Sequence, residues 1–151
     1  MLQFISNRVN FLKFITNSEV ETHDLGINIS RYFKRGQIVC LNGEMGTGKT
    51  AFVKGILKGL NYAGVVTSPT FAICHQYFAD INVYHLDLYR INGYEDLYSI
   101  GFFDIEDKDS VIFIEWAENA SEYLNDSFNI NFSYGKEENE RIIDIDDNLY
   151  K

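Results

Sequence analysis

The chain has 151 residues and a formal net charge of −9, with 22 acidic against 13 basic side chains. This length suits one domain with a single core, and the acidic balance argues against direct binding of DNA or RNA, which needs clustered lysine and arginine. No stretch reaches the roughly 18 apolar residues of a membrane span, and Cys40 and Cys74 lack metal-ligand spacing. We therefore expect one domain over residues 1–151, cytoplasmic and with reduced cysteines.

The first half of the chain predicts alternating strands and helices. In order, its patterns indicate a strand at 13–16, a helix at 18–33, a strand at 37–41, a helix at 51–57 and a turn at 61–64. Ser18 and Glu21 have the spacing of a capping box, which favours a helix start at that point.

The second half predicts more strands than helices. Its patterns indicate strands at 71–78 and 82–88 joined by a turn at 79–80, helices at 94–100 and 102–107, a strand at 110–116, a helix at 118–124, and paired strands at 128–133 and 141–145. The run at 110–116 is typical of a buried parallel strand. Together these elements predict an α/β fold of the phosphate-loop (P-loop) NTPase type, with a mixed, mostly parallel central sheet flanked by helices and an antiparallel C-terminal hairpin.

Residues 43–50 carry the most informative motif. Their sequence, Gly-Glu-Met-Gly-Thr-Gly-Lys-Thr, fits Gly-x-x-x-x-Gly-Lys-[Ser/Thr] between a predicted strand and helix, the context of a phosphate-binding loop. Lys49 would lie between the β- and γ-phosphates of a nucleotide, and Thr50 would ligate Mg²⁺. The competing interpretation is a plain glycine turn, which needs neither residue. The predicted ATP-binding residues of the loop are Gly43, Glu44, Met45, Gly46, Thr47, Gly48, Lys49 and Thr50.

Hydrolysis or transfer also needs a second carboxylate near Mg²⁺, at the carboxyl end of a parallel strand. Glu115 is the strongest candidate, because an apolar run precedes it and would carry it to the same sheet edge as Thr50. The alternative is a solvated acid at a strand end. Trp116, the only tryptophan, covers the site in one interpretation and belongs to the core in the other.

The segment 84–90, Tyr-His-Leu-Asp-Leu-Tyr-Arg, forms a second candidate group. Strand alternation places His85 and Asp87 on one face and the leucines on the other. Asp87 is predicted to order a metal-bound or attacking water and Arg90 to approach the γ-phosphate, with an Asp87–Arg90 ion pair as an equally weighted alternative. His85 is predicted to be a hydrogen-bonded structural residue.

Three hydroxyls surround the single proline in Thr67-Ser68-Pro69-Thr70. The segment follows the helix after the loop, where phosphate-loop proteins often have a switch that senses γ-phosphate and Mg²⁺, so Thr70 is a candidate contact. A proline-stiffened turn explains the same residues equally well.

Four motifs in this order resemble the TsaE (YjeE) family: the loop at 43–50, Thr-Ser-Pro-Thr-Phe at 67–71, His-Leu-Asp-Leu-Tyr-Arg at 85–90 and Ile-Glu-Trp at 114–116. The resemblance spans about residues 13–145. It implies a small bacterial ATPase of tRNA threonylcarbamoyladenosine (t⁶A) biosynthesis, which acts on adenosine 37 of tRNAs reading codons that begin with adenosine. It further implies weak activity alone, stimulation by TsaD- and TsaB-like partners, and contact with tRNA only through that complex.

The resemblance also implies roles for individual residues. Lys49 would contact the phosphates, Thr50 and Glu115 would hold Mg²⁺, and Asp87 would be catalytic or order water. The expected reaction is Mg²⁺-dependent ATP hydrolysis with a water nucleophile, in which the loop amides and Lys49 stabilise charge on the phosphate oxygens.

Three further positions follow from the same resemblance. Trp116 becomes part of the site, and the adenine is expected near Asn17 and Ser18 at the start of the first helix. Ala51 is a departure, because many relatives have a second threonine or serine there. Any hydroxyl role at that position is lost in this chain.

Other functions are also compatible with a phosphate-binding loop. A small metabolite or nucleotide kinase usually needs an arginine-rich lid, whereas the five arginines of this chain are scattered. A regulatory GTPase is disfavoured, because neither Asn-Lys-x-Asp nor Asp-x-x-Gly occurs. A nucleotide-gated assembly factor with incidental ATPase activity fits the sequence as well as an ATPase does.

Overall fold

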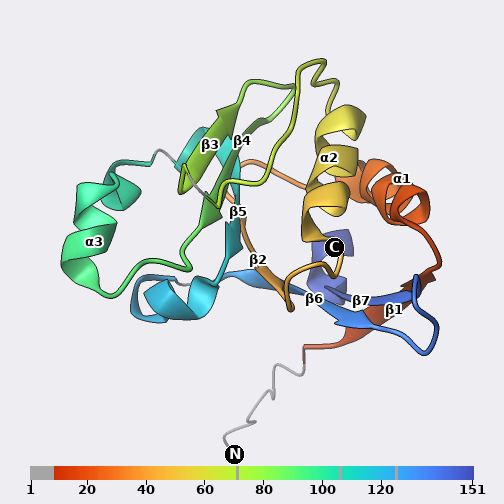
Figure 1. Ribbon diagram of the computed structural model, residues 1–151. Helices are drawn as coiled ribbons and strands as arrows, with labels where there is room; N and C mark the ends of the chain where they lie inside the picture. The colour runs from red at the N-terminus through yellow and green to blue at the C-terminus, as the bar shows by residue number, and fades with distance from the viewer. Residues whose placement is uncertain (1–8, 71, 106, 125) are drawn as a thin grey trace, which may run out of the picture.

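The computed structural model describes residues 9–70, 72–105, 107–124 and 126–151 (Figure 1). Seven strands of these residues form one sheet in the order β1-β7-β6-β2-β5-β4-β3. Their bounds are β1 Phe11–Thr16, β2 Ile38–Asn42, β3 Cys74–Tyr77, β4 Asn82–Asp87, β5 Ser110–Glu115, β6 Phe128–Tyr134 and β7 Arg141–Asp146.

The centre of the sheet is parallel and its edges are antiparallel. β2 pairs in parallel with both β5 and β6, and β4 pairs in parallel with β5. The β6–β7 hairpin, the β1–β7 pair and the β3–β4 pair are antiparallel. The predicted fold is confirmed, including the C-terminal hairpin. Because β4 and β5 run in the same direction and in register, Asp87 lies directly beside Glu115 at the carboxyl ends of the two strands.

Helices cover the two faces of the sheet (Figure 1). The helices are α1 Glu19–Ile29, α2 Lys49–Gly59 and α3 Tyr94–Ser99. Strand β5 shows why both faces are covered, since its side chains alternate between two cores. Val111 and Phe113 join the core that contains α2, whereas Ile112 and Ile114 join the core that contains Leu97 of α3.

α1 and α2 cross at a point where side chains are missing, which we call the glycine seam (Gly26, Gly55 and Gly59). A Cβ atom at Gly26 would overlap the carbonyl oxygen of Phe52, and one at Gly55 would overlap that of His23. The two backbones therefore approach more closely than any larger residue would permit. The seam fixes α2, and with it the loop from which α2 begins, against α1.

The predicted helix at 18–33 is too long. α1 ends at Ile29 and a 3₁₀ turn, η1 (Ser30–Tyr32), follows it. The Ser30 hydroxyl donates a hydrogen bond to the Ile27 carbonyl at 2.7 Å. Such local side-chain bonds compete with the helical ladder, which accounts for the early end.

The predicted strand at 71–78 is wrong at its start. β3 begins at Cys74, because Ile73 has a left-handed φ of 68° and its N–H bonds to the Pro69 carbonyl at 2.6 Å. This bond precedes β3, and residue 71 lies outside the described residues. The other predicted strands lie within two residues of the observed bounds.

The predicted helices at 102–107 and 118–124 are also wrong in type. The chain forms short 3₁₀ segments there: η2 Phe102–Asp104, η3 Asp107–Asp109 and η4 Ala117–Tyr123; a last one, η5 Asp147–Tyr150, ends the fold. Ala120 breaks η4 with a φ of −131°. Residue 106 lies outside the described residues.

Both cysteines are free, as predicted. Cys40 is buried in β2 and Cys74 is half-buried in β3. Burial raises the pKa of both thiols, so they stay protonated and weakly reactive near neutral pH. Across the described part of the chain, no helix has the length and hydropathy to cross a membrane.

Candidate functional site

The glycine-rich loop at 43–50 joins the end of β2 to the start of α2. Gly43, Gly46 and Gly48 have φ values of 151°, 81° and 101°, which residues other than glycine rarely adopt. A Cβ at Gly43 would also lie 2.5 Å from the Phe132 carbonyl oxygen on β6. These glycines are required by conformation, and they leave α2 with its N-terminal N–H groups at the loop, where an anion is favoured.

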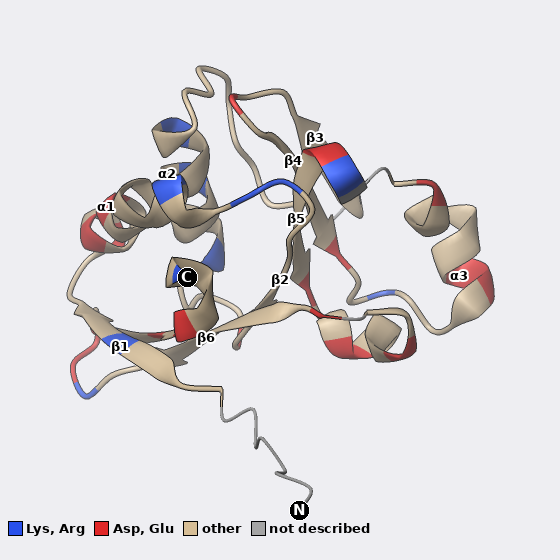
Figure 2. Cartoon of the chain, turned by 180° about the vertical axis from the view of Figure 1, so that it is seen from behind, with Lys and Arg blue, Asp and Glu red and all other residues tan. Residues whose placement is uncertain are grey.

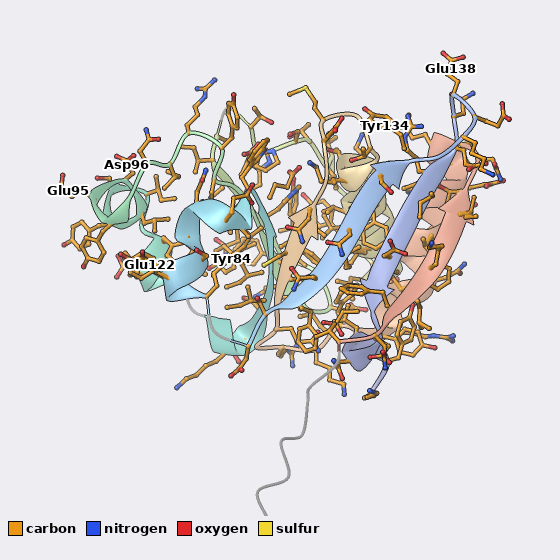
Figure 3. The ribbon with its side chains drawn as sticks, turned by 90° about the horizontal axis from the view of Figure 1, so that it is seen from below. Tyr84, Glu95, Asp96, Glu122, Tyr134 and Glu138 are labelled. Atoms are coloured by element: carbon orange, nitrogen blue, oxygen red, sulfur yellow. The ribbon has the colours of Figure 1, made fainter. Side chains whose placement is uncertain are left out.

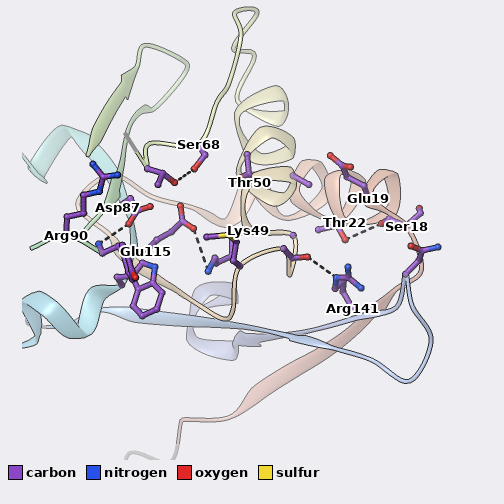
Figure 4. A pocket seen from close by; sticks show the side chains of 18 residues that line it. Ser18, Glu19, Thr22, Lys49, Thr50, Ser68, Asp87, Arg90, Glu115 and Arg141 are labelled. Carbon is purple, nitrogen blue, oxygen red and sulfur yellow. Dashed lines mark hydrogen bonds and ion pairs between the residues drawn. The ribbon is translucent and has the colours of Figure 1, made fainter. Parts of the chain in front are cut away.

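A cavity of about 720 Å³ opens beside the loop (Figure 4). Lys49 and Thr50 lie in its middle. One end, which we call the carboxylate end, holds Ser68, Asp87, Arg90 and Glu115; the other, the hairpin end, holds Ser18, Glu19, Thr22 and Arg141. A volume of this size accommodates a ligand of several hundred daltons.

Lys49 lies at the centre of the loop and is only 8% exposed. Its ammonium donates hydrogen bonds to the carbonyls of Gly43 and Glu44 and lies 3.7 Å from Oε1 of Glu115. A buried cation next to a buried carboxylate is stable only when both groups are paired. Here the loop carbonyls and Glu115 supply that pairing and fix the lysine in place.

Glu115 and Asp87 form the chemical core of the carboxylate end. They are 6% and 7% exposed, so the alternative of a solvated acid at the strand end is wrong for Glu115. Oδ1 of Asp87 accepts a hydrogen bond from the N–H of Tyr89 at 3.0 Å. The structure also brings Arg90 to the same end of the cavity.

His85 is fully buried and its Nε2 lies 3.0 Å from Oε2 of Glu115. Its Nδ1 has no hydrogen-bond partner among the described residues. We assign the proton to Nε2, because a buried N–H without an acceptor is costly, whereas Nε2–H donates to the carboxylate. The predicted structural role of His85 is thus specific: it holds one oxygen of Glu115 and leaves the other facing Lys49.

Trp116 begins a turn at the edge of the cavity. Its left-handed φ of 58° ends β5 and turns the chain into η4. Trp116 is 39% exposed and lines the cavity, and its ring is tilted by 58° against that of Tyr89, with 4.9 Å between the centroids. It is therefore a wall residue of the site and does not belong to the core. It also borders a smaller cavity of about 290 Å³ together with Gly43, Glu44 and Glu118.

The hydroxyl segment supplies two of its three side chains to the cavity. Ser68 and Thr70 line it, and their hydroxyls hydrogen bond to each other at 2.8 Å. Thr67 instead lies 3.5 Å from Nδ1 of His75 on β3. Thr70 is thus placed where a switch contact is expected.

The hairpin end includes residues that the sequence did not single out. The Tyr134 hydroxyl donates to the Met45 carbonyl at 2.6 Å, and Nε of Arg141 donates to the Gly46 carbonyl at 3.3 Å. The Arg141 guanidinium also lies over the Tyr134 ring, 4.7 Å from its centroid. The β6–β7 hairpin therefore holds the tip of the loop. No local signal marks these residues, because the contact depends on where the hairpin returns.

The start of α1 completes the hairpin end. Ser18 accepts a hydrogen bond from the N–H of Glu21 at 3.1 Å, which confirms the helix start at Ser18. Glu21 accepts its hydrogen bond from the N–H of Asn17 at 2.6 Å, one residue before the position that a capping box uses. Ser18, Glu19 and Thr22 line the cavity, whereas Asn17 does not. Glu19 and Thr22 were not predicted.

Some loop residues predicted to bind nucleotide do not face the larger cavity. Met45, Gly46, Gly48, Lys49 and Thr50 line it. Gly43 and Glu44 border the smaller cavity, and Thr47 is buried with its hydroxyl donating to the Glu44 carbonyl at 2.6 Å. Gly43, Glu44 and Thr47 therefore shape the loop and contribute backbone groups to it.

The donors in the middle and at the carboxylate end of the cavity suit a hard divalent cation. Thr50, Asp87 and Glu115 offer oxygen ligands, the type that Mg²⁺ prefers. Within the described ranges, no three His, Cys, Asp or Glu side chains converge into a metal centre. The set therefore fits Mg²⁺ that arrives with a phosphate, which supplies further oxygens.

The comparisons agree on one family. Residues 16–143 match the family model described as "Threonylcarbamoyl adenosine biosynthesis protein TsaE". The tRNA threonylcarbamoyladenosine biosynthesis protein TsaE of Treponema pallidum is 34% identical over 113 residues, covering 75% of this chain and 84% of the relative. That of Nostoc is 34% identical over 128 residues, covering 82% and 78%.

A solved structure supports the same conclusion. The crystal structure of YdiB from Bacillus subtilis matches with a TM-score of 0.74 and 30% sequence identity, covering 93% of this chain and 87% of that one. The glycine-rich loop, both carboxylates and β6 lie within the matched residues 16–143, and the match ends inside β7. The chain belongs to the TsaE family, whose members are named as tRNA threonylcarbamoyladenosine biosynthesis proteins.

Proposed function

We propose that this protein binds ATP with Mg²⁺ in the cavity and hydrolyses it in support of t⁶A formation at adenosine 37 of tRNAs reading codons that begin with adenosine. One observation carries the proposal. Lys49 in the glycine-rich loop lies 3.7 Å from Glu115, and Asp87 lies beside Glu115 in strand register. A cation for the phosphates and two carboxylates for the metal and water thus meet at one point, as phosphoryl transfer requires.

The two ends of the cavity suggest how the nucleotide lies. The triphosphate is drawn to Lys49 and the N-terminus of α2, which directs the γ-phosphate toward Asp87 and Glu115. The base then lies toward Ser18 and Arg141 at the hairpin end, in agreement with the adenine position that the family resemblance implies.

The reaction is the attack of water on the γ-phosphorus, with cleavage of the bond to the β–γ bridging oxygen and release of ADP and phosphate. Asp87 orients the water, and Lys49 with the loop N–H groups stabilises charge on the phosphate oxygens. Thr50 and Glu115 hold Mg²⁺, which supplies further neutralisation of that charge when bound. His85 keeps the Glu115 carboxylate in one orientation.

The site favours completion by partners. Of the basic side chains in the described residues, Lys49, Arg90 and Arg141 line the cavity, and Arg141 is directed to the loop tip. Charge that develops on the γ-phosphate in the transition state is commonly met by an added arginine from another protein. TsaD- and TsaB-like proteins are the proposed partners, and tRNA is reached only through them.

The test is a phosphate-release assay with the purified protein, with and without its TsaD- and TsaB-like partners. We expect weak, Mg²⁺-dependent hydrolysis alone and clear stimulation by the partners. Equal rates with and without partners would disprove completion of the site in trans. Transfer of phosphate to a metabolite, with no free phosphate, would instead indicate a kinase.

The same preparation separates an ATPase from a nucleotide-gated assembly factor. A non-hydrolysable ATP analogue is added, and t⁶A is measured over one turnover and then over many. If hydrolysis serves catalysis, the first turnover already fails. If t⁶A forms normally over many turnovers, hydrolysis is incidental and ATP occupancy alone controls assembly.

A further inference from the structure

An exposed group of aromatic rings lies beside the carboxylate end, and the mechanism above does not use it. It consists of Tyr94 and Tyr98 on α3, Phe103 on η2 and Tyr123 on η4, which we call the aromatic face. These side chains are 55%, 68%, 42% and 37% exposed. Tyr94 is the hub, with its ring centroid 6.4 Å from that of Tyr98, 5.1 Å from Phe103 and 5.9 Å from Tyr123.

The rings pack on one another and leave their outer surfaces in water. Beneath them, Leu97 of α3 and Ala117 and Ala120 of η4 anchor these segments to the second core. None of the four aromatic rings is part of that core. A contiguous exposed patch of large aromatic side chains is typical of a protein interface.

The charges around the aromatic face limit which molecules can bind to it. The three segments that carry it hold Glu95, Asp96, Asp104, Glu118 and Glu122, and none of their residues is lysine or arginine. Figure 2 shows acidic residues on α3, and Figure 3 shows Glu95, Asp96 and Glu122 at the same end of the molecule. This rim repels RNA phosphates, and it repels a second copy of the same face.

The face is also connected to both catalytic carboxylates. Seven residues after Asp87 the chain reaches Tyr94, and η4 begins directly after Glu115 and Trp116. The two paths are tied together, because the Leu88 N–H donates to the Glu115 carbonyl at 3.0 Å and Asn119 donates to the Leu88 carbonyl at 2.8 Å. These hydrogen bonds link the segments that carry the aromatic face to the strand ends that carry Asp87 and Glu115.

We propose that the aromatic face is the docking surface for a protein whose apolar patch is ringed by lysine and arginine, and that docking there stimulates hydrolysis. The apolar centre packs against the tyrosines, and cations contact the ring faces and the acidic rim. The inference rests on the proposed function, since it assigns a surface to the stimulating partner.

The test compares Tyr98→Ala and Glu122→Lys with two matched controls, Phe78→Ala and Glu138→Lys. Phe78 is 70% exposed in the turn between β3 and β4, and Glu138 lies on the hairpin at the opposite end of the molecule (Figure 3). Calorimetry measures the affinity of each protein for the TsaD- and TsaB-like pair with ATP present, and phosphate release measures the basal and stimulated rates. Circular dichroism confirms folding.

We expect Tyr98→Ala to bind about tenfold more weakly or worse, as for a truncated interface aromatic. Glu122→Lys should bind more weakly and lose part of the salt dependence. Both should keep the wild-type basal rate and lose stimulation in proportion to binding, while the controls behave as wild type.

Three outcomes overturn the inference. They are unchanged binding and stimulation in both variants, equal losses in the controls, and a wild-type dimer that Tyr98→Ala dissociates. A wild-type protein that binds its partners but never hydrolyses ATP would refute the proposed function instead, while the binding measurements would still decide the surface.

Discussion

The two ends of the cavity are built in different ways. At the carboxylate end, Glu115, Asp87 and His85 are nearly or fully buried, and neighbouring strands fix their positions by register. At the hairpin end, the loop tip is exposed, with Met45 86% and Tyr134 47% accessible, and side chains from β7 and β6 hold its carbonyls. Water screens the interactions between buried charges only weakly, so the strength of these interactions depends on the distances and angles between the groups.

This difference predicts that substitutions at one end change the rate of hydrolysis, whereas substitutions at the other end change the affinity for the nucleotide. Groups at the carboxylate end face the atoms that react, so their loss should lower kcat. Groups at the hairpin end touch the loop and the part of the ligand that does not react, so their loss should raise KM with kcat nearly unchanged. Four predictions test this division.

Lys49→Ala should have the largest effect, because Lys49 lies between the two ends and contributes to both binding and rate. We expect kcat/KM for ATP to fall about 10³-fold, as when one preorganised charge contact in an active site is removed. Steady-state phosphate release measures it. Lys58→Ala, an exposed lysine on the same helix, is the control. A fall confined to KM would contradict the role of Lys49 in the transition state.

Asp87→Asn and Glu115→Gln should each lower the stimulated kcat about 10²-fold. Nucleotide affinity measured in EDTA should change little for Asp87→Asn, since Asp87 acts through water. Glu115→Gln also removes the charge that pairs with Lys49, so this control applies to Asp87 alone. Asp144→Asn on β7 controls for loss of a carboxylate elsewhere. Full stimulated turnover in either variant would remove that residue from the mechanism.

His85→Phe should lower kcat about tenfold, because Glu115 loses the partner that orients it. His85→Gln should recover most of the loss, since the glutamine amide can donate from nearly the same position as Nε2. The measurement is the kcat of His85→Phe compared with that of His85→Gln. If both lose activity equally while remaining folded, His85 serves the core and does not orient Glu115.

Tyr134→Phe should have the smallest effect. It removes one hydrogen bond to the Met45 carbonyl, worth about 1 kcal/mol, so nucleotide Kd should rise about fivefold with kcat unchanged. Tyr84→Phe is matched to it, because it removes a hydrogen bond with Gln76 at 3.0 Å on the other side of the sheet. A drop in kcat for Tyr134→Phe would erase the division between the two ends.

The carboxylate end could be predicted from the sequence because its signals are local. Gly43 to Thr50 form a contiguous motif, and Asp87 and Glu115 each end an apolar strand, so the parallel fold brings them to one edge. The contact between His85 and Glu115 needs the strand register, which the sequence does not specify.

The hairpin end could be predicted only in part, at Ser18, because its other signals are not local. Tyr134 and Arg141 reach the loop only because β6 pairs beside β2, a contact between segments about 90 residues apart in sequence. The misjudged helices at 102–107 and 118–124 have a different cause. Their residues pack mainly as short turns over the second core, so tertiary contacts override weak helical patterns.

The glycine seam also fixes a distance in the cavity. α1 begins at the hairpin end and α2 begins at Lys49, so the closeness of the two helices sets the span between Lys49 and the hairpin end of the cavity. Because backbone atoms meet at Gly26 and Gly55, no repacking of side chains restores that span once a larger residue separates the helices. Second-site suppressors of Gly55→Ala should therefore be rare, whereas the surrounding core can exchange one aliphatic residue for another.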